Sequence, residues 1–183
     1  MNTLTIDRTK AWTVEDYILL GEVKTPCQLI NGELIMSPAP SPLHQKVLRE
    51  LFIVFHDRVL SGEILFAPID LYIDKQNVFQ PDLVYLSEEN KKFLTERGIE
   101  GPPDLIVEII SPSNSYTDRN QKKNMYLKFG VKEYWIVDPA NKTVEIYTPL
   151  NGADVPVTFV AEKGEVKSTI IENLKFELTT ILA

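Results

Sequence analysis

The chain has 183 residues, of which 44% are hydrophobic and 25% are charged, and its formal net charge at pH 7 is −7. This length and balance exclude a disordered or fibrous protein and predict one globular domain over residues 1–183. The negative charge argues against a protein that coats nucleic acid nonspecifically, because such proteins present a broad basic face to the phosphates. It leaves open an enzyme whose cleft is lined by metal-binding carboxylates.

The single cysteine, Cys27, excludes a disulfide within the chain and a zinc cluster built from cysteines. Its expected environment is that of a small, partly buried apolar side chain. No apolar run follows the N-terminal MNTLTIDRTK, and no later run is long enough to span a membrane. We therefore expect a cytoplasmic protein without a membrane partner.

The N-terminal part predicts a short helix, a hairpin and a long helix. Thr13, followed by Glu15 and Asp16, predicts a short capped helix. Asn31-Gly32 predicts the tight turn of a two-stranded hairpin over residues 28–37. Ser41 as N-cap and Pro42 at the first helical position predict a helix to about residue 60. Its buried stripe is expected to be Val47, Leu48, Leu51, Val54, Phe55 and Val59.

The following part predicts a sheet. Three strands are expected, at 64–73, 82–86 and 104–110, with a short helix at 88–97. A helix over about 116–129, capped by Gly130, and a buried strand at 134–137 come next. Segments 143–147, 155–160 and 166–171 should add antiparallel strands. The core order is thus helix, strand, strand, strand, helix, strand. This predicts an α/β domain with a mixed central sheet, extended by the N-terminal hairpin and the C-terminal antiparallel strands.

Two Pro-Asp pairs, at Asp82 and Asp104, compete for a place beside Glu108. Asp104 and Glu108 share one strand, so their side chains start roughly 13 Å apart, too far to chelate one ion. Asp82 begins another strand, and neighbouring strands lie about 4.8 Å apart. Asp82 and Glu108 can therefore converge on one metal ion if their strands are adjacent. An unpaired carboxylate in DLIVEII is costly, so the alternative role of Glu108 is a buried salt bridge.

The helix after this strand carries Asp118, Lys122 and Tyr126 at four-residue intervals, which places them on one face. Lys122 can then point toward the end of the Glu108 strand. The alternative is an exposed pair of Asp118 and Lys122, which would contribute little stability. Arg119, Lys123 and Lys128 add a modest basic feature to the helix, which a solvated helix surface also explains.

These residues resemble a known family. PDLVYLS, GPPDLIVEIISPSNSYTDRNQKK and VKEYWIVDP are similar to the Uma-type restriction endonuclease family of the PD-(D/E)XK nuclease superfamily. The upstream segments TVEDYILL, LINGEL, SPAPSPLHQ and FAPIDLYI extend the resemblance, which covers roughly residues 12 to 150. It implies a restriction-endonuclease-like core.

The resemblance also implies a set of site residues. The superfamily's usual lysine would stand two residues after Glu108, where this chain has Ile110. The Uma-type pattern implies instead a lysine from the following helix, a position that Lys122 matches. It adds Glu33 and His44, which by themselves would be a solvated strand residue and a polar first-turn residue. Relatives usually have Glu where this chain has Gln28.

The function that the resemblance implies is a metal-dependent endonuclease that hydrolyses phosphodiester bonds in DNA. Mg²⁺ or Mn²⁺ would be held by Asp82, Glu108 and a backbone carbonyl at Ile109, with Lys122 orienting the attacking water or stabilising the developing charge. Zinc is disfavoured because the oxygen ligands are hard. Superfamily members often pair to cut both strands, which implies a possible homodimer. The alternatives are a catalytically inactive nuclease-fold module that binds nucleic acid or protein, and a metal-dependent hydrolase of a smaller phosphate ester.

Overall fold

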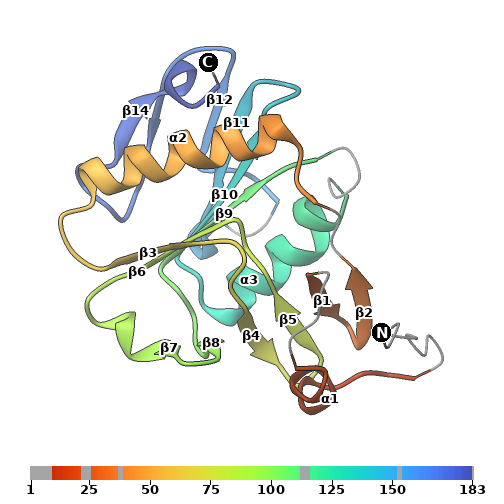
Figure 1. Cartoon of the computed structure of the whole chain (residues 1–183). Coiled ribbons are helices and arrows are strands. Elements are labelled where there is room, and N and C mark those ends of the chain that lie inside the picture. Colours follow the sequence, from red (N-terminus) through yellow and green to blue (C-terminus); the bar gives the residue numbers. More distant parts are fainter. Residues whose placement is uncertain (1–9, 22–25, 37–38, 112–115, 152–153, 183) are drawn as a thin grey trace.

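A computed structural model describes residues 10–21, 26–36, 39–111, 116–151 and 154–182. The described chain contains two six-stranded sheets and a separate two-stranded ribbon (Figure 1). Helices cover both faces of one six-stranded sheet, here called the central sheet, which agrees with the expected mixed α/β architecture. Within the described residues, no helix is long and apolar enough to cross a membrane.

The central sheet has the strand order β12-β11-β10-β9-β6-β3. Its strands are β3 (Glu63–Phe66), β6 (Leu83–Leu86), β9 (Leu105–Ile109), β10 (Glu133–Asp138), β11 (Thr143–Tyr147) and β12 (Thr158–Ala161). Strands β9 and β10 are parallel and the other pairs are antiparallel, so the sheet is mixed. With its two helices it follows the predicted core order.

Helix α2 (Pro42–Arg58) covers one face of this sheet. The Ser41 side chain accepts the His44 N–H at 3.2 Å, which confirms the predicted N-cap. The five residues from Val47 to Phe55 of the predicted stripe are buried, and Val59 packs against them partly buried. The helix ends at Arg58, two residues before the predicted end.

The opposite face is covered by a helix with two parts. Thr117–Lys122 forms a π-helical turn, here called the π turn, and α3 (Lys123–Phe129) continues it as an α-helix. Gly130, with φ of 112°, ends α3 in the left-handed conformation that glycine adopts readily. The extent of the predicted helix is confirmed, but its wide first part was not predicted.

The second sheet has the order β2-β1-β5-β4-β8-β7. Its strands are β1 (Cys27–Ile30), β2 (Glu33–Met36), β4 (Leu71–Asp74), β5 (Asn77–Phe79), β7 (Leu94–Thr95) and β8 (Gly98–Ile99). The hairpin of β1 and β2 is confirmed, with positive φ at Asn31 and Gly32, although its predicted end at Ser37 lies outside the described residues. It belongs to this second sheet and does not extend the central one.

Two predicted elements of this region are wrong in detail. Residues 64–73 form two strands in different sheets, because Pro68 interrupts the run and cannot donate to a ladder. Residues 88–97 form a 3₁₀ turn (Asn90–Phe93) and then β7. Pairing with β8, and the bond from the Ile99 N–H to the Asp70 carbonyl, outweigh the local helix preference.

The C-terminal and N-terminal segments complete the fold. β13 (Glu165–Lys167) pairs with β14 (Lys175–Glu177) as a separate ribbon, so the predicted strand at 166–171 does not extend the central sheet. The ribbon's apolar residues join the core beneath α2. At the other end, α1 (Val14–Leu19) has the predicted cap, a reciprocal capping box between Thr13 and Asp16.

Candidate active site

Asp82 and Glu108 lie on adjacent strands, as the sequence predicted. Leu83 of β6 is opposite Val107 of β9 in an antiparallel pair, which places the preceding Asp82 beside the following Glu108. The Asp82 carboxylate also accepts the backbone N–H of Ile109 at 2.7 Å. Asp104 lies before the opposite end of β9, where it accepts a hydrogen bond from Lys132.

Glu108 points toward the face of the sheet that α3 covers. Side chains alternate along a strand: Val107 and Ile109 belong to the core beneath α2, whereas Ile106 and Ile110 belong to the core beneath α3. On this second face the Glu108 carboxylate accepts hydrogen bonds from Lys122 Nζ at 3.0 Å and from the Tyr126 hydroxyl at 2.7 Å. The four-residue spacing of Lys122 and Tyr126 therefore lets the π turn and α3 both contact Glu108, the one charged residue of β9.

Lys122 lies between two buried carboxylates. Its Nζ is also 3.1 Å from Asp118 Oδ1, and the exposed fractions are 3% for Glu108, 2% for Asp118 and 4% for Lys122. The alternative of an exposed Asp118–Lys122 pair is therefore wrong. Sequence reasoning placed Asp118 on the right helix face but did not count it as a site residue. Its spacing from Lys122 and Tyr126 was the signal that could have identified it.

With all of its carboxylates ionised, the site would hold more negative charge than positive charge. Burial raises the pKa of Glu108 to about 8, even though the nearby Lys122 lowers it. Burial also raises the pKa of Asp118, again against the effect of Lys122. Burial alone would lower the pKa of Lys122, but the charges of Glu108 and Asp118 raise it above the ordinary lysine value. One ammonium thus serves two buried carboxylates, and the charge of Asp82 acts on both of them.

His44 reaches the site from the first turn of α2. Its Nε2 lies 3.1 Å from Asp82 Oδ2, and its Nδ1 is buried without a hydrogen-bond partner among the described residues. Burial lowers the pKa of His44, but the hydrogen bond and charge of Asp82 outweigh this and raise it overall. Protonated His44 is therefore favoured beside the Asp82 carboxylate.

Glu33 stands apart from these residues. It is exposed on β2, and its side chain makes no hydrogen bond or ion pair with the described part of the chain. Gln28, on the paired strand, accepts the backbone N–H of Gln80 at 3.1 Å. The structure therefore brings together Asp82, Glu108, Lys122 and His44, adds Asp118 and Tyr126, and leaves Glu33 outside their contacts.

The donor chemistry of the site fits a hard divalent cation. Asp82 and Glu108 offer carboxylate oxygens, and Ile109, whose carbonyl was the third predicted ligand, is the last residue of β9. A divalent ion would balance the excess negative charge of the cluster. As the described side chains are arranged, no group of three or more His, Cys, Asp or Glu residues is spaced to hold a metal ion. Glu108 Oε1 is engaged by Lys122 and Tyr126 instead.

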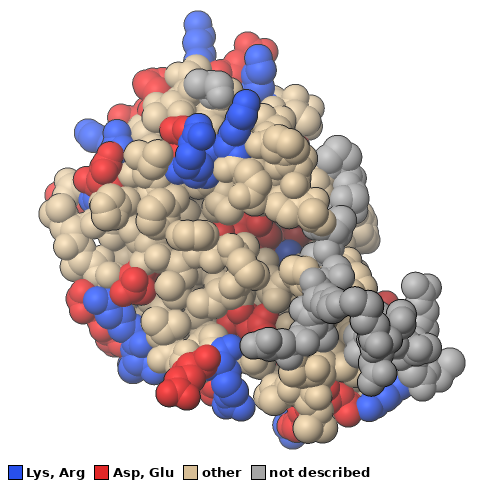
Figure 2. All heavy atoms as spheres, in the orientation of Figure 1, with Lys and Arg blue, Asp and Glu red and all other residues tan. Residues whose placement is uncertain are grey.

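The basic residues of the π turn and α3 do not form one basic surface. Arg119 forms ion pairs with two carboxylates of the central sheet, Lys122 is buried, and Lys123 lies over an aromatic ring. Of the four basic residues, only Lys128 is exposed. Figure 2 shows acidic and basic atoms together in a hollow near the middle of one face, with most other charged side chains toward the periphery. The predicted basic feature is therefore directed mainly into the fold.

Comparison with known proteins places the chain in a family. A family model, Uma2, described as a putative restriction endonuclease, matches residues 14–180. The chain belongs to the Uma2 family. The resemblance seen in the sequence is thereby confirmed, and Uma2 membership makes the chain a nuclease-like protein.

Two similar proteins cover almost the whole Uma2 chain. An uncharacterised protein of Synechocystis sp. (strain ATCC 27184 / PCC 6803 / Kazusa), sll1609, is 26% identical over 177 residues, which is 92% of this chain and 99% of that protein. The crystal structure of a putative nuclease belonging to DUF820 from Anabaena variabilis ATCC 29413 matches with a TM-score of 0.79. That match has 20% identity and covers 93% of this chain and 97% of the other. The mixed α/β fold class is confirmed.

Proposed function

We propose that this protein is a metal-dependent endonuclease that hydrolyses phosphodiester bonds in DNA. The observation that carries the proposal is the buried pair of Glu108 and Asp118 around Lys122, with the partly exposed Asp82 on the adjacent strand. A protein that needed only stability would gain little from this cluster, because removing two or more charges from water is costly. Buried groups with strongly shifted pKa values cluster at functional sites.

Each side chain has a proposed role that follows from its contacts. Asp82 and Glu108, with the Ile109 carbonyl, would hold Mg²⁺ or Mn²⁺. When bound, the ion would supply positive charge that polarises the scissile phosphate and acidifies a water molecule. Lys122, which lies 3.0 Å from Glu108, would orient the attacking water or stabilise the charge that develops on the phosphate. Asp118 would keep the lysine in its charged form.

His44 has a supporting role in the proposal. His44 Nε2 and the Ile109 N–H both contact Asp82 Oδ2, and together they fix the direction of the carboxylate. Among the described residues, Oδ1 is the oxygen left to face a cation. The family's restriction endonuclease description supports DNA as the substrate. The net charge of −7 does not oppose this, because binding at a hollow does not require a basic surface overall.

The test is cleavage of supercoiled circular DNA by purified protein with Mg²⁺ or Mn²⁺, and with a chelator as control. We expect nicked or linear products with metal only. Asp82→Asn, Glu108→Gln and Lys122→Met should each abolish cleavage, whereas Asp104→Asn should retain it. Asp104 is the matched control because it is a buried carboxylate beside the same strand. Cleavage at the wild-type rate by the Asp82→Asn protein would overturn the site assignment.

A second candidate is a nuclease-fold protein that binds nucleic acid or protein without cleaving. Two observations favour this alternative. Glu108 is engaged by Lys122, and the described residues contain no three ligand groups spaced for a metal ion. It predicts DNA binding in a mobility-shift assay with no metal-dependent products. Turnover of a small phosphodiester in the same buffers, without DNA cleavage, would instead favour a hydrolase of smaller esters.

A further inference from the structure

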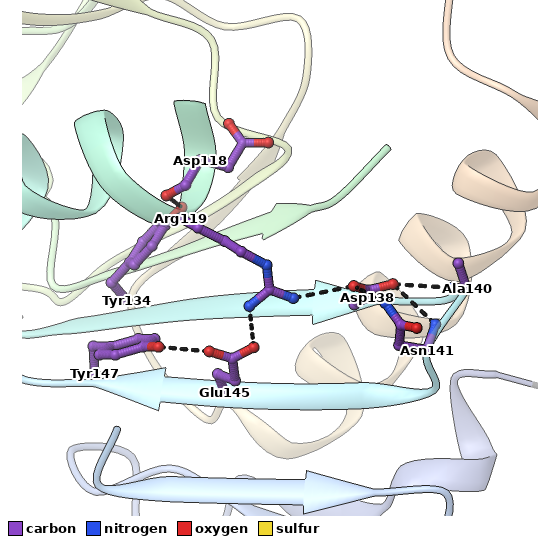
Figure 3. A network of polar contacts seen from close by, with 8 residues as sticks. All are labelled: Asp118, Arg119, Tyr134, Asp138, Ala140, Asn141, Glu145 and Tyr147. Carbon is purple, nitrogen blue, oxygen red and sulfur yellow. Dashed lines mark hydrogen bonds and ion pairs between the residues drawn. The ribbon is translucent and has the colours of Figure 1, made fainter. Parts of the chain in front are cut away.

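Arg119 lies next to Asp118 in the π turn but contacts the central sheet instead of the candidate site. Figure 3 shows its guanidinium directed toward β10 and β11. We propose that Arg119, Asp138 and Glu145, here called the Arg119 clamp, hold the π turn in the position that keeps Lys122 against Glu108. Arg119 is thus a positioning residue. Its importance for cleavage rests on the proposed function, whereas its hold on Lys122 can be tested without it.

The Arg119 clamp joins one helix residue to two neighbouring strands. Arg119 Nη2 donates to Asp138 Oδ2 at 3.0 Å, and Nη1 donates to Glu145 Oε1 (Figure 3). Asp138 ends β10 and Glu145 lies on β11, which pairs with β10 in the antiparallel sense. A guanidinium can engage both carboxylates because its N–H groups form a rigid fork. The π turn is therefore attached to the sheet at two points.

The two carboxylates are themselves held in place. Asp138 accepts the backbone N–H groups of Ala140 and Asn141 at 3.1 and 3.0 Å, and the Asn141 side-chain amide at 2.9 Å. Glu145 Oε2 accepts the Tyr147 hydroxyl at 2.5 Å. Both carboxylates are largely buried, and the N–H groups around Asp138 lower its pKa against the effect of burial. Arg119 therefore binds a preorganised pair of acceptors.

The same turn is connected directly to the candidate site. The Tyr134 hydroxyl donates to the Asp118 carbonyl at 3.0 Å (Figure 3), while the Asp118 carboxylate faces Lys122. Lys123, which follows Lys122 in the chain, places its Nζ 4.3 Å from the centre of the Tyr147 ring. The helix thus has a site face, with Asp118 and Lys122, and a clamp face, with Arg119 and Lys123. A shift of the clamp face moves the site face with it.

The attached segment is a π turn. π-helical turns are rare, are found in short pieces and occur frequently at functional sites. The two ion pairs of the Arg119 clamp and the Tyr134 bond supply contacts from outside the helix, so the turn does not depend on its own backbone bonds alone. Without them, we expect the segment to relax and Lys122 to leave Glu108 more often.

The first experiment measures Lys122 without using activity. The full-length wild-type, Arg119→Ala, Arg119→Lys and Arg97→Ala proteins are treated with an amine-acylating reagent, and modification of each lysine is followed by peptide mass spectrometry. Lys132, which is exposed, is the internal reference. Arg97→Ala is the matched control because it removes an exposed ion pair with Glu100. We expect acylation of Lys122 to be at least tenfold faster in Arg119→Ala, intermediate in Arg119→Lys and unchanged in Arg97→Ala.

The second experiment separates positioning from folding. In folded protein, Arg119→Ala should lower kcat for DNA cleavage at least tenfold and leave KM within about twofold, with partial recovery in Arg119→Lys, since lysine can make one of the two ion pairs. If Arg119→Ala does not fold, Glu145→Gln, which weakens one ion pair, takes its place. An unchanged rate of Lys122 acylation overturns the clamp. Faster acylation with unchanged kcat overturns its role in cleavage, and a wild type without cleavage contradicts the proposed function alone.

Discussion

The two ends of β9 carry the same kind of ion pair in different surroundings. At one end, Asp104 pairs with Lys132 at 2.6 Å, and the lysine side chain is 55% exposed. At the other, Glu108 pairs with Lys122 at 3.0 Å, and that lysine is 5% exposed. Lys132 and the Ser87 N–H lower the pKa of Asp104 despite its burial, whereas burial raises the pKa of Glu108 to about 8.

The difference lies in how well each carboxylate is compensated. Asp104 has an ammonium to itself and a backbone N–H at 2.7 Å, so its ionised form is satisfied. Glu108 shares its ammonium with Asp118 and lies near a third carboxylate, so its ionised form lacks positive charge. The first pair therefore stabilises the fold, and the second leaves a deficit that a proton or a metal ion can fill.

Removing each lysine gives the largest expected contrast. Lys122→Met leaves two buried carboxylates without a cation, and at about pH 9 it should lower the free energy of unfolding by about 3–5 kcal/mol. Lys132→Met should cost less than about 1 kcal/mol, because its ammonium is largely solvated. Urea titration of both variants measures the two values. Equal losses would contradict the distinction between the two ends of β9.

The pH dependence of stability should have opposite signs at the two carboxylates. Because the folded pKa of Glu108 is raised, the folded state holds an extra proton between about pH 4.5 and pH 8, and stability falls as pH rises through this window, by at most about 1.4 kcal/mol per pH unit. Glu108→Gln should flatten this slope in metal-free protein.

Asp104 should act at the acidic end instead. Its folded pKa is lowered, so its contribution is present above its unfolded pKa and is lost as pH falls through the folded pKa. Asp104→Asn should therefore change the unfolding free energy most above about pH 4 and leave the slope at higher pH as in the wild type. If the unfolding free energy of Glu108→Gln fell more steeply with rising pH than that of the wild type, the assignment of the alkaline slope to Glu108 would be contradicted.

Adding metal should remove the deficit at Glu108. If Mg²⁺ or Mn²⁺ binds the folded protein, a free concentration of about one hundred times Kd stabilises it by about 2.7 kcal/mol. We expect a higher Tm in the wild type and in Asp104→Asn, and no shift in Glu108→Gln. Thermal unfolding with and without each ion provides the measurement. A similar shift in all three proteins would place the ion elsewhere.

Local and semi-local signals predicted much of this site. The Asn31-Gly32 turn and the Ser41 cap are short-range features that tertiary contacts did not override. The cost of a buried charge singled out Glu108, and strand spacing selected Asp82 over Asp104. The four-residue spacing from Lys122 to Tyr126 survived as contacts with Glu108. In each case one physical constraint acted over a few residues.

Partners distant in sequence could not be predicted in the same way. Arg119 and Glu145 are 26 residues apart, and nothing in either segment indicates their pairing, so the sequence places Arg119 in a modest basic feature or on a solvated helix surface. The burial of Asp118 depends on how the π turn packs on β10, which spacing alone does not determine. The helix expected at 88–97 failed because strand pairing at Ile99 decided the backbone. The break at Pro68, by contrast, had a visible signal.

The smallest expected effect concerns His44, which contacts Asp82 beside the Glu108 end of β9. His44→Phe removes one hydrogen bond from Asp82, but the Ile109 N–H remains and Nδ1 loses no partner, so we expect a loss of about 1 kcal/mol. The folded pKa of His44 is raised, so its contribution is complete below the unfolded pKa and disappears as pH rises through the folded pKa.

The difference between His44→Phe and the wild type should therefore be larger at about pH 5.5 than at about pH 9. His56→Phe is the matched control, since His56 is an exposed residue of the same helix that stacks on Phe52. Its unfolding free energy should stay within about 0.5 kcal/mol of the wild type at both pH values. A larger loss in His44→Phe at the alkaline pH would mean that neutral His44 stabilises Asp82, and that the imidazole does not supply the positive charge that Glu108 and Asp118 lack.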